Sequence, residues 1–405
     1  RNVEITIQVY LPMRFSVLVI RIYCVSLLVC LLTTGCALFR FGEPPEQPAG
    51  FGEQLDRILK GKGSNTQAAL DTLLSGKTMP VCENGKCFFF YKAAADRTIA
   101  VAGDWNAWDA GVDMLQPIPK TDYYFLTKEF PPNARLDYRI VDNGNRIVDP
   151  RNPRTCEGQY GPNSELAMPG YRVPEELNVP DDVPEGVLEE LVFESEILSG
   201  TRALSVYLPP DYGREYGPHP FLIVQDGVEF IRLAHFPRVV DYLVHQQKIR
   251  RVVLVFVEPA DRNVDYESEK YSRFIAEELI PYLRANYDVC KDRENCGIMG
   301  VSLGASAAFR TALKYPEVFG KVAGQSVCFG SDDQIFQAVQ NGGGKTLQFH
   351  FDVGLFETNP EMSLLTQSRR MRDLLAAQGC AFTYNEHPEG HSWGNWRAHL
   401  DDILL

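Results

Sequence analysis

The stretch that most constrains how this chain folds is "CGIMGVSLGASAAFRTALKY", in which Ser302 stands between Gly300 and Gly304. The apolar residues before the serine predict a buried strand, and the alanine-rich residues after it predict a helix. On such a sharp strand-to-helix turn a serine hydroxyl is exposed at the end of the strand, beside the positive end of the helix. A plain glycine-rich turn is the alternative, but the flanking elements favour a nucleophilic serine.

Residues 190–405 alternate between apolar runs and helical patterns, which predicts an α/β domain with a mostly parallel sheet covered on both faces. The expected strands are "HPFLIVQDG", "RRVVLVFVEP", "CGIMGVSLG", "KVAGQSVCFG", "LQFHFDVG" and "AFTYNEH". Helical patterns lie between them, for example over residues 266–287 and 363–378. The serine then stands at the end of one of these strands.

A serine needs a base that removes its proton, and in this fold the base follows in the chain with an acid between the two. Four histidines follow Ser302. We predict that His391 is the base, because it comes after the last expected strand in the glycine-flanked loop "EGHSWG". For the acid, "FDVGLFETN" offers Glu357 beyond the strand end and Asp352 within the strand. We predict Glu357, which would orient the imidazole and stabilise its charged form, with Asp352 as the alternative.

Acyl transfer also needs two donors that point at the developing oxyanion. One is expected to be the backbone N–H of Leu303, directly after the nucleophile. The other is expected in the loop "QDGVEF", as the N–H of Val228, with Gly227 permitting a close approach. The alternative for this loop is an ordinary turn.

Five stretches of this part carry a resemblance to a known family: "YLPPDY", "VQDGVEF", "ELIPYLRANY", "GIMGVSLGASAAFRTALKYPEVFG" and "EGHSWGNWR". Residues 188–405 resemble the esterase D family of α/β-hydrolases, nearest to its enterochelin esterase-like branch, with the feruloyl esterases as cousins. The resemblance implies the nucleophile, acid and base named above, and a catecholate siderophore ester or an aromatic acyl ester as substrate. Trp396 and Arg397 match the Trp-Arg pair that follows the family's histidine.

Three side chains are candidates for substrate contacts. Trp393 stands two residues after the predicted base and is expected to form a wall of the pocket. Arg262 and Arg397 are expected to meet an anionic or catecholate group, with a structural ion pair as the alternative. Trp396 is expected to pack and to fix the path of the loop into the last helix.

Residues 81–172 contain short alternating runs separated by Gly, Pro, Asn and Asp, which predicts a small all-β domain built as an immunoglobulin-like sandwich. The stretches "VAGDWNAWD", "LDYRIVDNG" and "VDPRNP" resemble the glycogen-binding type of carbohydrate-binding module. The resemblance implies that Trp108 stacks on sugar, whereas Arg146 stands where the family has its other stacking tryptophan. Trp105 is expected in the core. The alternative is a domain that packs on the esterase and shapes its entrance.

The N-terminal residues 1–36 predict export. From Met13 a basic start precedes an apolar run and the small residues "TTG", directly before Cys36. This layout is typical of an export signal, and the "TTGC" ending resembles a bacterial lipoprotein signal, which implies a lipid anchor on Cys36. The alternative is an uncleaved anchor helix, although the run is short for a membrane span. Both place the bulk of the protein outside the cytoplasm, and the expected location is the bacterial cell envelope, as a membrane-anchored lipoprotein that faces the periplasm or the surface.

Two connecting segments are expected, a Pro/Gly-rich tether with a weak helix over residues 37–80 and an acidic, proline-rich linker over residues 173–189. In an oxidising compartment the close pairs Cys82/Cys87 and Cys290/Cys296 are candidate disulfides. The formal net charge of −13 argues against nucleic acid as a partner. No P-loop, HExxH or paired CxxC signature is present, so no cofactor and no metal is expected.

Together these features predict an exported serine esterase that hydrolyses a small-molecule carboxylic ester through an acyl-enzyme on Ser302. Two alternatives stay open. One is an acyltransferase of the same fold, because the nucleophile and base do not distinguish transfer from hydrolysis. The other is a carbohydrate-binding surface lipoprotein with a glycan partner, in which the hydrolase domain is an inactive scaffold.

Overall fold

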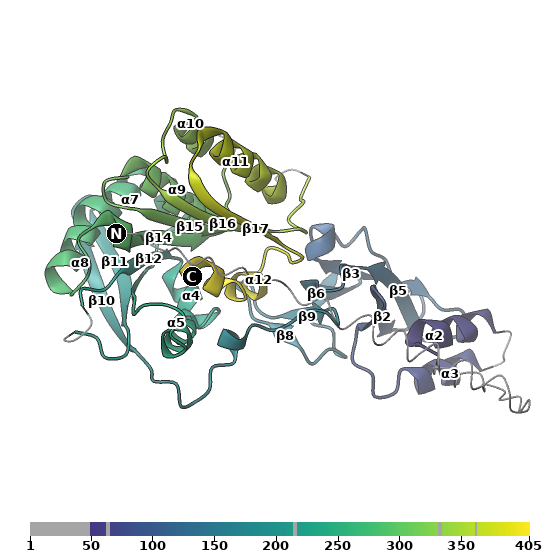
Figure 1. Ribbon diagram of the computed structural model, residues 1–405. Coiled ribbons are helices and arrows are strands. Elements are labelled where there is room, and N and C mark those ends of the chain that lie inside the picture. The colour runs from purple at the N-terminus through teal and green to yellow at the C-terminus, as the bar shows by residue number, and fades with distance from the viewer. Residues whose placement is uncertain (1–48, 62–64, 214–216, 331–333, 361–362) are drawn as a thin grey trace, which may run out of the picture. The chain divides into compact units, whose positions relative to one another are not determined.

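An eight-stranded sheet forms the centre of the α/β region, residues 187–405 (Figure 1). The structure is a computed structural model that describes residues 49–61, 65–213, 217–330, 334–360 and 363–405. The strands are β10 (Val187–Ser195), β11 (Gly200–Leu208), β13 (Val253–Val257), β12 (Phe221–Gln225), β14 (Cys296–Val301), β15 (Lys321–Gln325), β16 (Gln348–Gly354) and β17 (Ala381–His387), in that spatial order. All neighbours from β13 to β17 pair parallel, whereas β11 pairs antiparallel with β10 and β13. The prediction of a mostly parallel sheet is therefore confirmed.

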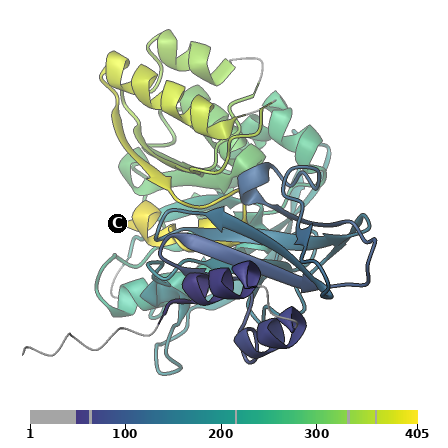
Figure 2. The ribbon, with the colours of Figure 1, turned by 90° about the vertical axis from the view of Figure 1, so that its right-hand side faces the viewer.

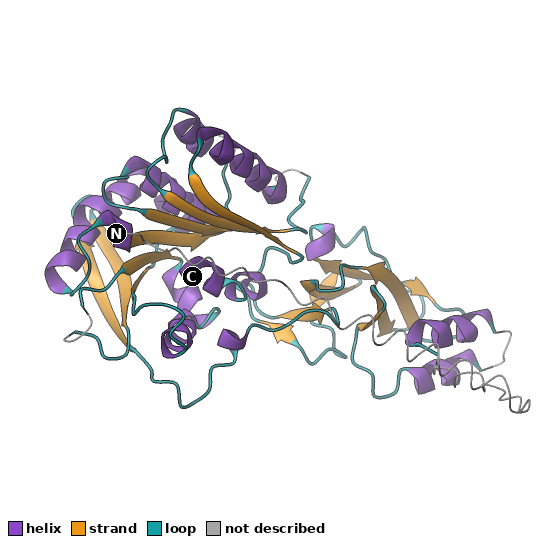
Figure 3. Ribbon diagram, in the orientation of Figure 1, coloured by secondary structure: helices purple, strands orange, loops and turns teal. Residues whose placement is uncertain are grey.

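Helices cover both faces of this sheet. Successive side chains of a strand point to opposite faces, and here the side chains on both faces are apolar and packed under helices. In β12, Phe221 and Ile223 pack into one hydrophobic cluster and Val224 into another. The first cluster includes residues of α6 (Arg262–Glu267), α7 (Glu269–Arg273), the π-helical turn η3 (Phe274–Leu279), α8 (Ile280–Asn286), α9 (Ser302–Lys314), α10 (Gln334–Gln340) and α11 (Leu364–Gln378). The second includes residues of α4 (Gly227–Arg232), α5 (Phe236–His245), α12 (Trp393–Arg397) and α13 (Leu400–Leu404). Figure 3 shows these helices on either side of the strands.

The β-rich region, residues 81–167, contains two antiparallel sheets. One has the order β1, β2, β5, β4, and the other has the order β3, β6, β9, β8, with β7 paired to β6. Their strands are β1 (Val81–Glu83), β2 (Lys86–Lys92), β3 (Ile99–Gly103), β4 (Gln116–Pro117), β5 (Tyr123–Glu129), β6 (Arg135–Asp142), β7 (Asn145–Ile147), β8 (Thr155–Cys156) and β9 (Asn163–Ala167). The immunoglobulin-like assignment of this region stays a prediction.

The run "KCFFFYK" of β2 is apolar at successive positions because both faces of the strand are covered. Phe89 packs with residues of the second sheet, such as Tyr138, whereas Phe88 and Phe90 pack against Phe51. Phe51 begins α2 (Phe51–Lys60), which with α3 (Thr66–Leu73) lies over the outer face of the first sheet (Figure 2).

The predicted disulfides have different outcomes. Cys82 and Cys87 form a disulfide between directly paired residues of β1 and β2. The pairing of Cys290 with Cys296 was wrong, since both are free thiols. Cys296 is the first residue of β14 and packs in the core of the sheet, while the thiol of Cys290 faces the carbonyl oxygen of Pro218 at 3.2 Å.

Residues Gly50–Leu405 form one compact unit. The predicted export segment and the lipidation site Cys36 lie outside the described residues. Within the described ranges, no helix has the length and apolar character required to cross a membrane. Strand β10 begins at Val187, so the last three residues of the predicted linker belong to the sheet of the α/β region.

Candidate active site

Ser302 is the first residue of α9 and directly follows the last residue of β14. Its φ angle is +52°, a left-handed conformation that is uncommon for residues other than glycine and clusters at functional turns. Neither glycine of the motif has room for a side chain. A Cβ on Gly300 would lie 2.5 Å from the carbonyl carbon of Gly304, and one on Gly304 would lie 2.5 Å from Oδ2 of Asp226. The strand, the strained serine and the helix thus have the arrangement of a nucleophile elbow.

Glu357 and His391 are in direct contact. Glu357 lies in the loop after β16, and its Oε2 is 2.6 Å from Nδ1 of His391. Its Oε1 accepts hydrogen bonds from the hydroxyl of Ser326 at 2.6 Å and from the N–H of Gly354 at 2.8 Å. The Glu357 side chain is only 1% exposed, whereas that of His391 is 41% exposed. The carboxylate is therefore fixed on one side, and the imidazole is accessible on the other.

The alternative acid, Asp352, lies inside β16 and is fully buried. It accepts a hydrogen bond from the side-chain amide of Gln325 at 3.2 Å, and no hydrogen bond among the described residues joins it to His391. Burial raises the pKa of Asp352 to about 7. The structure therefore brings Glu357, rather than Asp352, to the predicted base.

Ser302 and His391 line the same cavity, which has a volume of about 680 Å³. Both regions of the chain contribute to its wall. Residues from the α/β region include Glu258, Arg262 and Trp393, and residues from the β-rich region and its loops include Trp108, Arg146 and Tyr160.

The two predicted oxyanion donors stand at helix starts. Leu303 is the second residue of α9, where a backbone N–H has no acceptor within its own helix. Val228 is the second residue of α4, and its N–H donates to Oε2 of Glu258 at 3.1 Å. Gly227 permits a close approach, as expected, but the group that approaches it is the neighbouring strand β13. A Cβ on Gly227 would lie 2.8 Å from Cβ of Phe256.

Glu258 was missed by the sequence analysis. Burial raises its pKa to about 7, the Val228 N–H opposes the shift, and the carboxylates of Glu229 and Asp226 add to it. A signal was present, because Glu258 directly follows β13, and the carboxyl ends of parallel strands form the ligand-binding edge of such sheets.

The two candidate arginines differ in position. The guanidinium of Arg262 lines the cavity but makes two hydrogen bonds to the carboxylate of Asp226, at 2.7 and 3.0 Å, and a third to the carbonyl oxygen of Val301. It therefore forms the structural ion pair that was the alternative. Arg397 ends α12 and is not among the described residues that line the cavity.

The tryptophans of the last loop have distinct partners. Trp393 is buried, packs edge-on against Phe230 and Trp396, and lines the cavity. Trp396 lies edge-on to the His391 ring, with 4.9 Å between centroids, and its indole N–H donates to the hydroxyl of Ser326 at 2.8 Å. Because Ser326 in turn donates to the predicted acid, Trp396 holds the acid and base loops together. Sequence reasoning missed Ser326.

Trp108 faces the cavity that contains Ser302. Its indole N–H donates to Asp104 at 3.2 Å, and its carbonyl oxygen accepts from Arg146 at 2.7 Å. Tyr160, which is 87% exposed, lines the same cavity. The residue predicted to stack on sugar thus lines the same cavity as Ser302 and His391. Trp105 packs against the core between the two sheets, as expected.

One group of side chains has the composition of a metal site. Suitable atoms of His387, His399 and Asp402 lie within 4.8 Å of one another. The two imidazole rings are stacked nearly parallel, 3.4 Å apart, so their in-plane lone pairs do not converge on one ion. His399 also pairs with Glu389 at 2.9 Å. Stacking and ion pairing account for this group.

Comparison with known proteins places the α/β region in a family. The family model described as "Putative esterase" matches residues 195–405, more than half of the chain. The uncharacterized protein YjcH of Bacillus subtilis is 30% identical over 234 residues, which cover 54% of this chain and 96% of YjcH. The endo-1,4-beta-xylanase/feruloyl esterase of Xylanibacter ruminicola is 24% identical over 154 residues, covering 34% of this chain and 21% of that protein.

Solved structures share the fold. The ferric enterobactin esterase of Salmonella typhimurium has a TM-score of 0.69 at 18% identity, covering 82% of this chain and 97% of its own. The enterochelin esterase of Shigella flexneri has a TM-score of 0.65 at 19% identity, and the match covers 82% of this chain and 96% of that esterase. Because the family model matches more than half of the chain, the chain belongs to the esterase family of α/β-hydrolases and is a carboxylic ester hydrolase.

Proposed function

We propose that this esterase cleaves its substrate through an acyl-enzyme formed on Ser302. The observation that carries the proposal is the 2.6 Å contact between the buried Glu357 carboxylate and Nδ1 of His391. His391 lines the same cavity as Ser302, which is held at positive φ. A carboxylate at Nδ1 holds the ring proton there and leaves Nε2 as the acceptor for the serine proton.

The acylation step follows from these positions. His391 takes the proton of the Ser302 hydroxyl while Oγ forms a bond to the ester carbonyl carbon. The carbonyl oxygen becomes an oxyanion that accepts from the N–H of Leu303, and from the N–H of Val228 once Glu258 releases it. Each such donor contributes about 10²–10³-fold in rate. The bond to the alcohol oxygen then breaks, and His391 returns its proton to the leaving alkoxide.

Deacylation repeats the sequence with water. His391 removes a proton from water as the water oxygen attacks the acyl carbon, and the same N–H groups donate to the second oxyanion. The bond to Oγ breaks, the proton passes to Ser302, and the carboxylic acid leaves. The Glu357 carboxylate stabilises the imidazolium in both steps.

For the substrate, we propose an ester of an aromatic or catecholate acid. Three aromatic side chains, Trp108, Tyr160 and Trp393, line the cavity beside Ser302, and aromatic faces stack well on planar rings. The support from relatives is the feruloyl esterase of Xylanibacter ruminicola and the fold shared with enterobactin esterases.

A fluorophosphonate probe tests the acyl-enzyme. The probe should label the wild type and leave Ser302→Ala unlabelled, and equal labelling of the two proteins would refute the proposal. A panel of p-nitrophenyl acyl esters, methyl ferulate and a catecholate trilactone, each with Ser302→Ala as control, then defines the substrate class. Analysis of the products in the presence of an added alcohol separates hydrolysis from acyl transfer.

We also propose that the enzyme works in the bacterial cell envelope, anchored through Cys36. Support comes from the export-type pattern before Cys36 and from the Cys82–Cys87 disulfide, which is typical of an oxidising compartment. Metabolic labelling with an alkyne fatty acid should mark the wild type and fail to mark Cys36→Ser. Equal incorporation into both proteins would contradict the anchor.

A further inference from the structure

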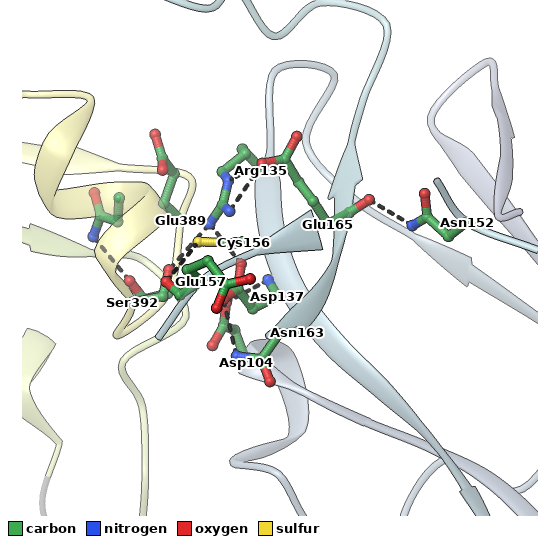
Figure 4. A network of polar contacts seen from close by, with 12 residues as sticks. Asp104, Arg135, Asp137, Asn152, Cys156, Glu157, Asn163, Glu165, Glu389 and Ser392 are labelled. Carbon is green, nitrogen blue, oxygen red and sulfur yellow. Dashed lines mark hydrogen bonds and ion pairs between the residues drawn. The ribbon is translucent and has the colours of Figure 1, made fainter. Parts of the chain in front are cut away.

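Arg135, the first residue of β6, connects the β-rich region to the loop of the predicted base (Figure 4). Its side chain is only 1% exposed. One end of the guanidinium donates to the hydroxyl of Ser392, directly after His391, at 3.0 Å. The backbone N–H of Arg135 also donates to the carbonyl oxygen of Pro388, at 3.2 Å. The same residue therefore contacts the loop on both sides of His391.

Two carboxylates hold the guanidinium in this orientation. Asp137 pairs with Nη1 at 2.7 Å, and Glu165 pairs with Nη2 at 3.0 Å. Figure 4 shows Arg135 between these acids and Ser392. A buried charge with partners on several sides has little freedom to move, because any displacement leaves a carboxylate without its counter-charge. Arg135 is thus a rigid support for the loop.

The loop has glycine at two positions that lie against the β-rich region. A Cβ on Gly394 would overlap the guanidinium of Arg135, and a Cβ on Gly390 would overlap the carboxylate of Asp104. Asp104 is itself fixed, since it accepts from the backbone N–H of Asp137 at 2.7 Å. The loop therefore fits against the β-rich region only without side chains at these positions, which flank His391.

The loop of the predicted acid is connected to the same contact. The ring of Phe356, next to Glu357, packs against Phe130 of the β-rich region, with 6.1 Å between centroids. The backbone N–H of Phe356 donates to the carbonyl oxygen of Glu389 at 3.1 Å. The β-rich region thus touches both loops that carry the acid–base pair, and a hydrogen bond joins the two loops.

We propose that Arg135 is a positioning residue that holds the loop of residues 388–394 so that His391 faces Ser302. This inference rests on the proposed role of His391 as base. Its consequence is that the β-rich region acts on the rate of the chemical step and does more than line the entrance. A displacement of about 1 Å in a catalytic group can lower a rate by about 10²-fold. Loss of the contact with Ser392 would therefore lower the rate even if it moved His391 by less than that.

The test uses the mildest change that breaks the contact. Removing Arg135 would leave the buried carboxylate of Asp137 and the partly buried carboxylate of Glu165 without a counter-charge and endanger folding, so the variant is Ser392→Ala in the chain of 405 residues. Ser164→Ala is the matched control. It also removes a buried hydroxyl of the β-rich region, one that accepts from the N–H of Asp149 at 2.8 Å and, among the described residues, makes no hydrogen bond to the loop.

We expect Ser392→Ala to lower kcat about tenfold with KM within about twofold of the wild type. The rate of fluorophosphonate labelling should fall by the same factor. Ser392→Thr, which restores the hydroxyl, should recover most of the loss, and Ser164→Ala should keep wild-type kcat.

Two outcomes separate this inference from the proposed function. An active wild type with Ser392→Ala at full kcat, or with the same loss in Ser164→Ala, would overturn the positioning role alone. A wild type that neither hydrolyses esters nor reacts with the probe would overturn the proposed function, and the positioning role with it.

Discussion

Replacing Glu357 by glutamine tests the predicted acid through the direction of a single hydrogen bond. In the structure, Oε1 of Glu357 accepts from the N–H of Gly354 at 2.8 Å and Oε2 faces Nδ1 of His391 at 2.6 Å. A backbone N–H can only donate, so the amide oxygen of the introduced glutamine must take the Oε1 position. The amide NH₂ then faces Nδ1, and the ring proton moves to Nε2. The imidazole would hold a proton where it has to accept one from Ser302.

The expected loss is large because two effects add. The wrong tautomer blocks proton transfer, and the neutral amide no longer stabilises the imidazolium, in a site where the acid is 1% exposed. Loss of the equivalent charge in serine hydrolases lowers kcat by about 10⁴-fold. At about 1.4 kcal/mol per factor of ten, this corresponds to about 5.5 kcal/mol of transition-state stabilisation.

The assay is kcat/KM for a p-nitrophenyl ester, with circular dichroism to confirm that the variant is folded. Asp352→Asn is the matched control. It makes the same carboxylate-to-amide change in a buried acid that bonds Gln325 and not His391, and we expect activity within about threefold of the wild type. A folded Glu357→Gln within tenfold of the wild type, or an equal loss in Asp352→Asn, would refute the assignment.

Three further predictions concern the cavity and the fold. Because burial raises the pKa of Glu258 to about 7, its carboxyl becomes charged as the pH rises through 7, and the charged form holds the Val228 N–H away from an oxyanion. The kcat/KM of Glu258→Gln relative to the wild type should therefore increase with pH, and a constant ratio would contradict this. Trp108→Ala should lower kcat/KM about fivefold for methyl ferulate and leave p-nitrophenyl acetate unaffected; equal effects on both would exclude stacking. Cys82→Ser, which opens a disulfide of sequence separation 5, should lower the free energy of unfolding by about 2 kcal/mol in urea titrations without changing kcat.

The elbow and the acid–base contact could be predicted because each depends on a local pattern together with chain order. Ser302 is recognised from its strand and helix, and Glu357 and His391 are the residues that follow the ends of β16 and β17. In a parallel sheet the carboxyl ends of neighbouring strands lie at the same edge. Residues that directly follow these strands in the sequence are therefore close in space.

The partners of these residues could not be predicted, because they come from distant segments with no pattern of their own. Glu258 reaches the Val228 N–H only because β12 and β13 are paired neighbours. Arg262 carries a charge that could bind an anionic substrate, but the carboxylate of Asp226, 36 positions earlier, pairs with that charge. Arg135 and Ser392 are 257 positions apart. Only the packing of one region on another brings such pairs together.

The contact at Arg135 implies that the base loop and the β-rich region constrain each other's sequence. In this chain, a side chain at Gly390 or Gly394 would overlap Asp104 or Arg135, neither of which can move without breaking its own bonds. A change on one side therefore requires a compensating change on the other. The geometry around His391 is a property of both regions, and the catalytic step should respond to substitutions at either side of this contact.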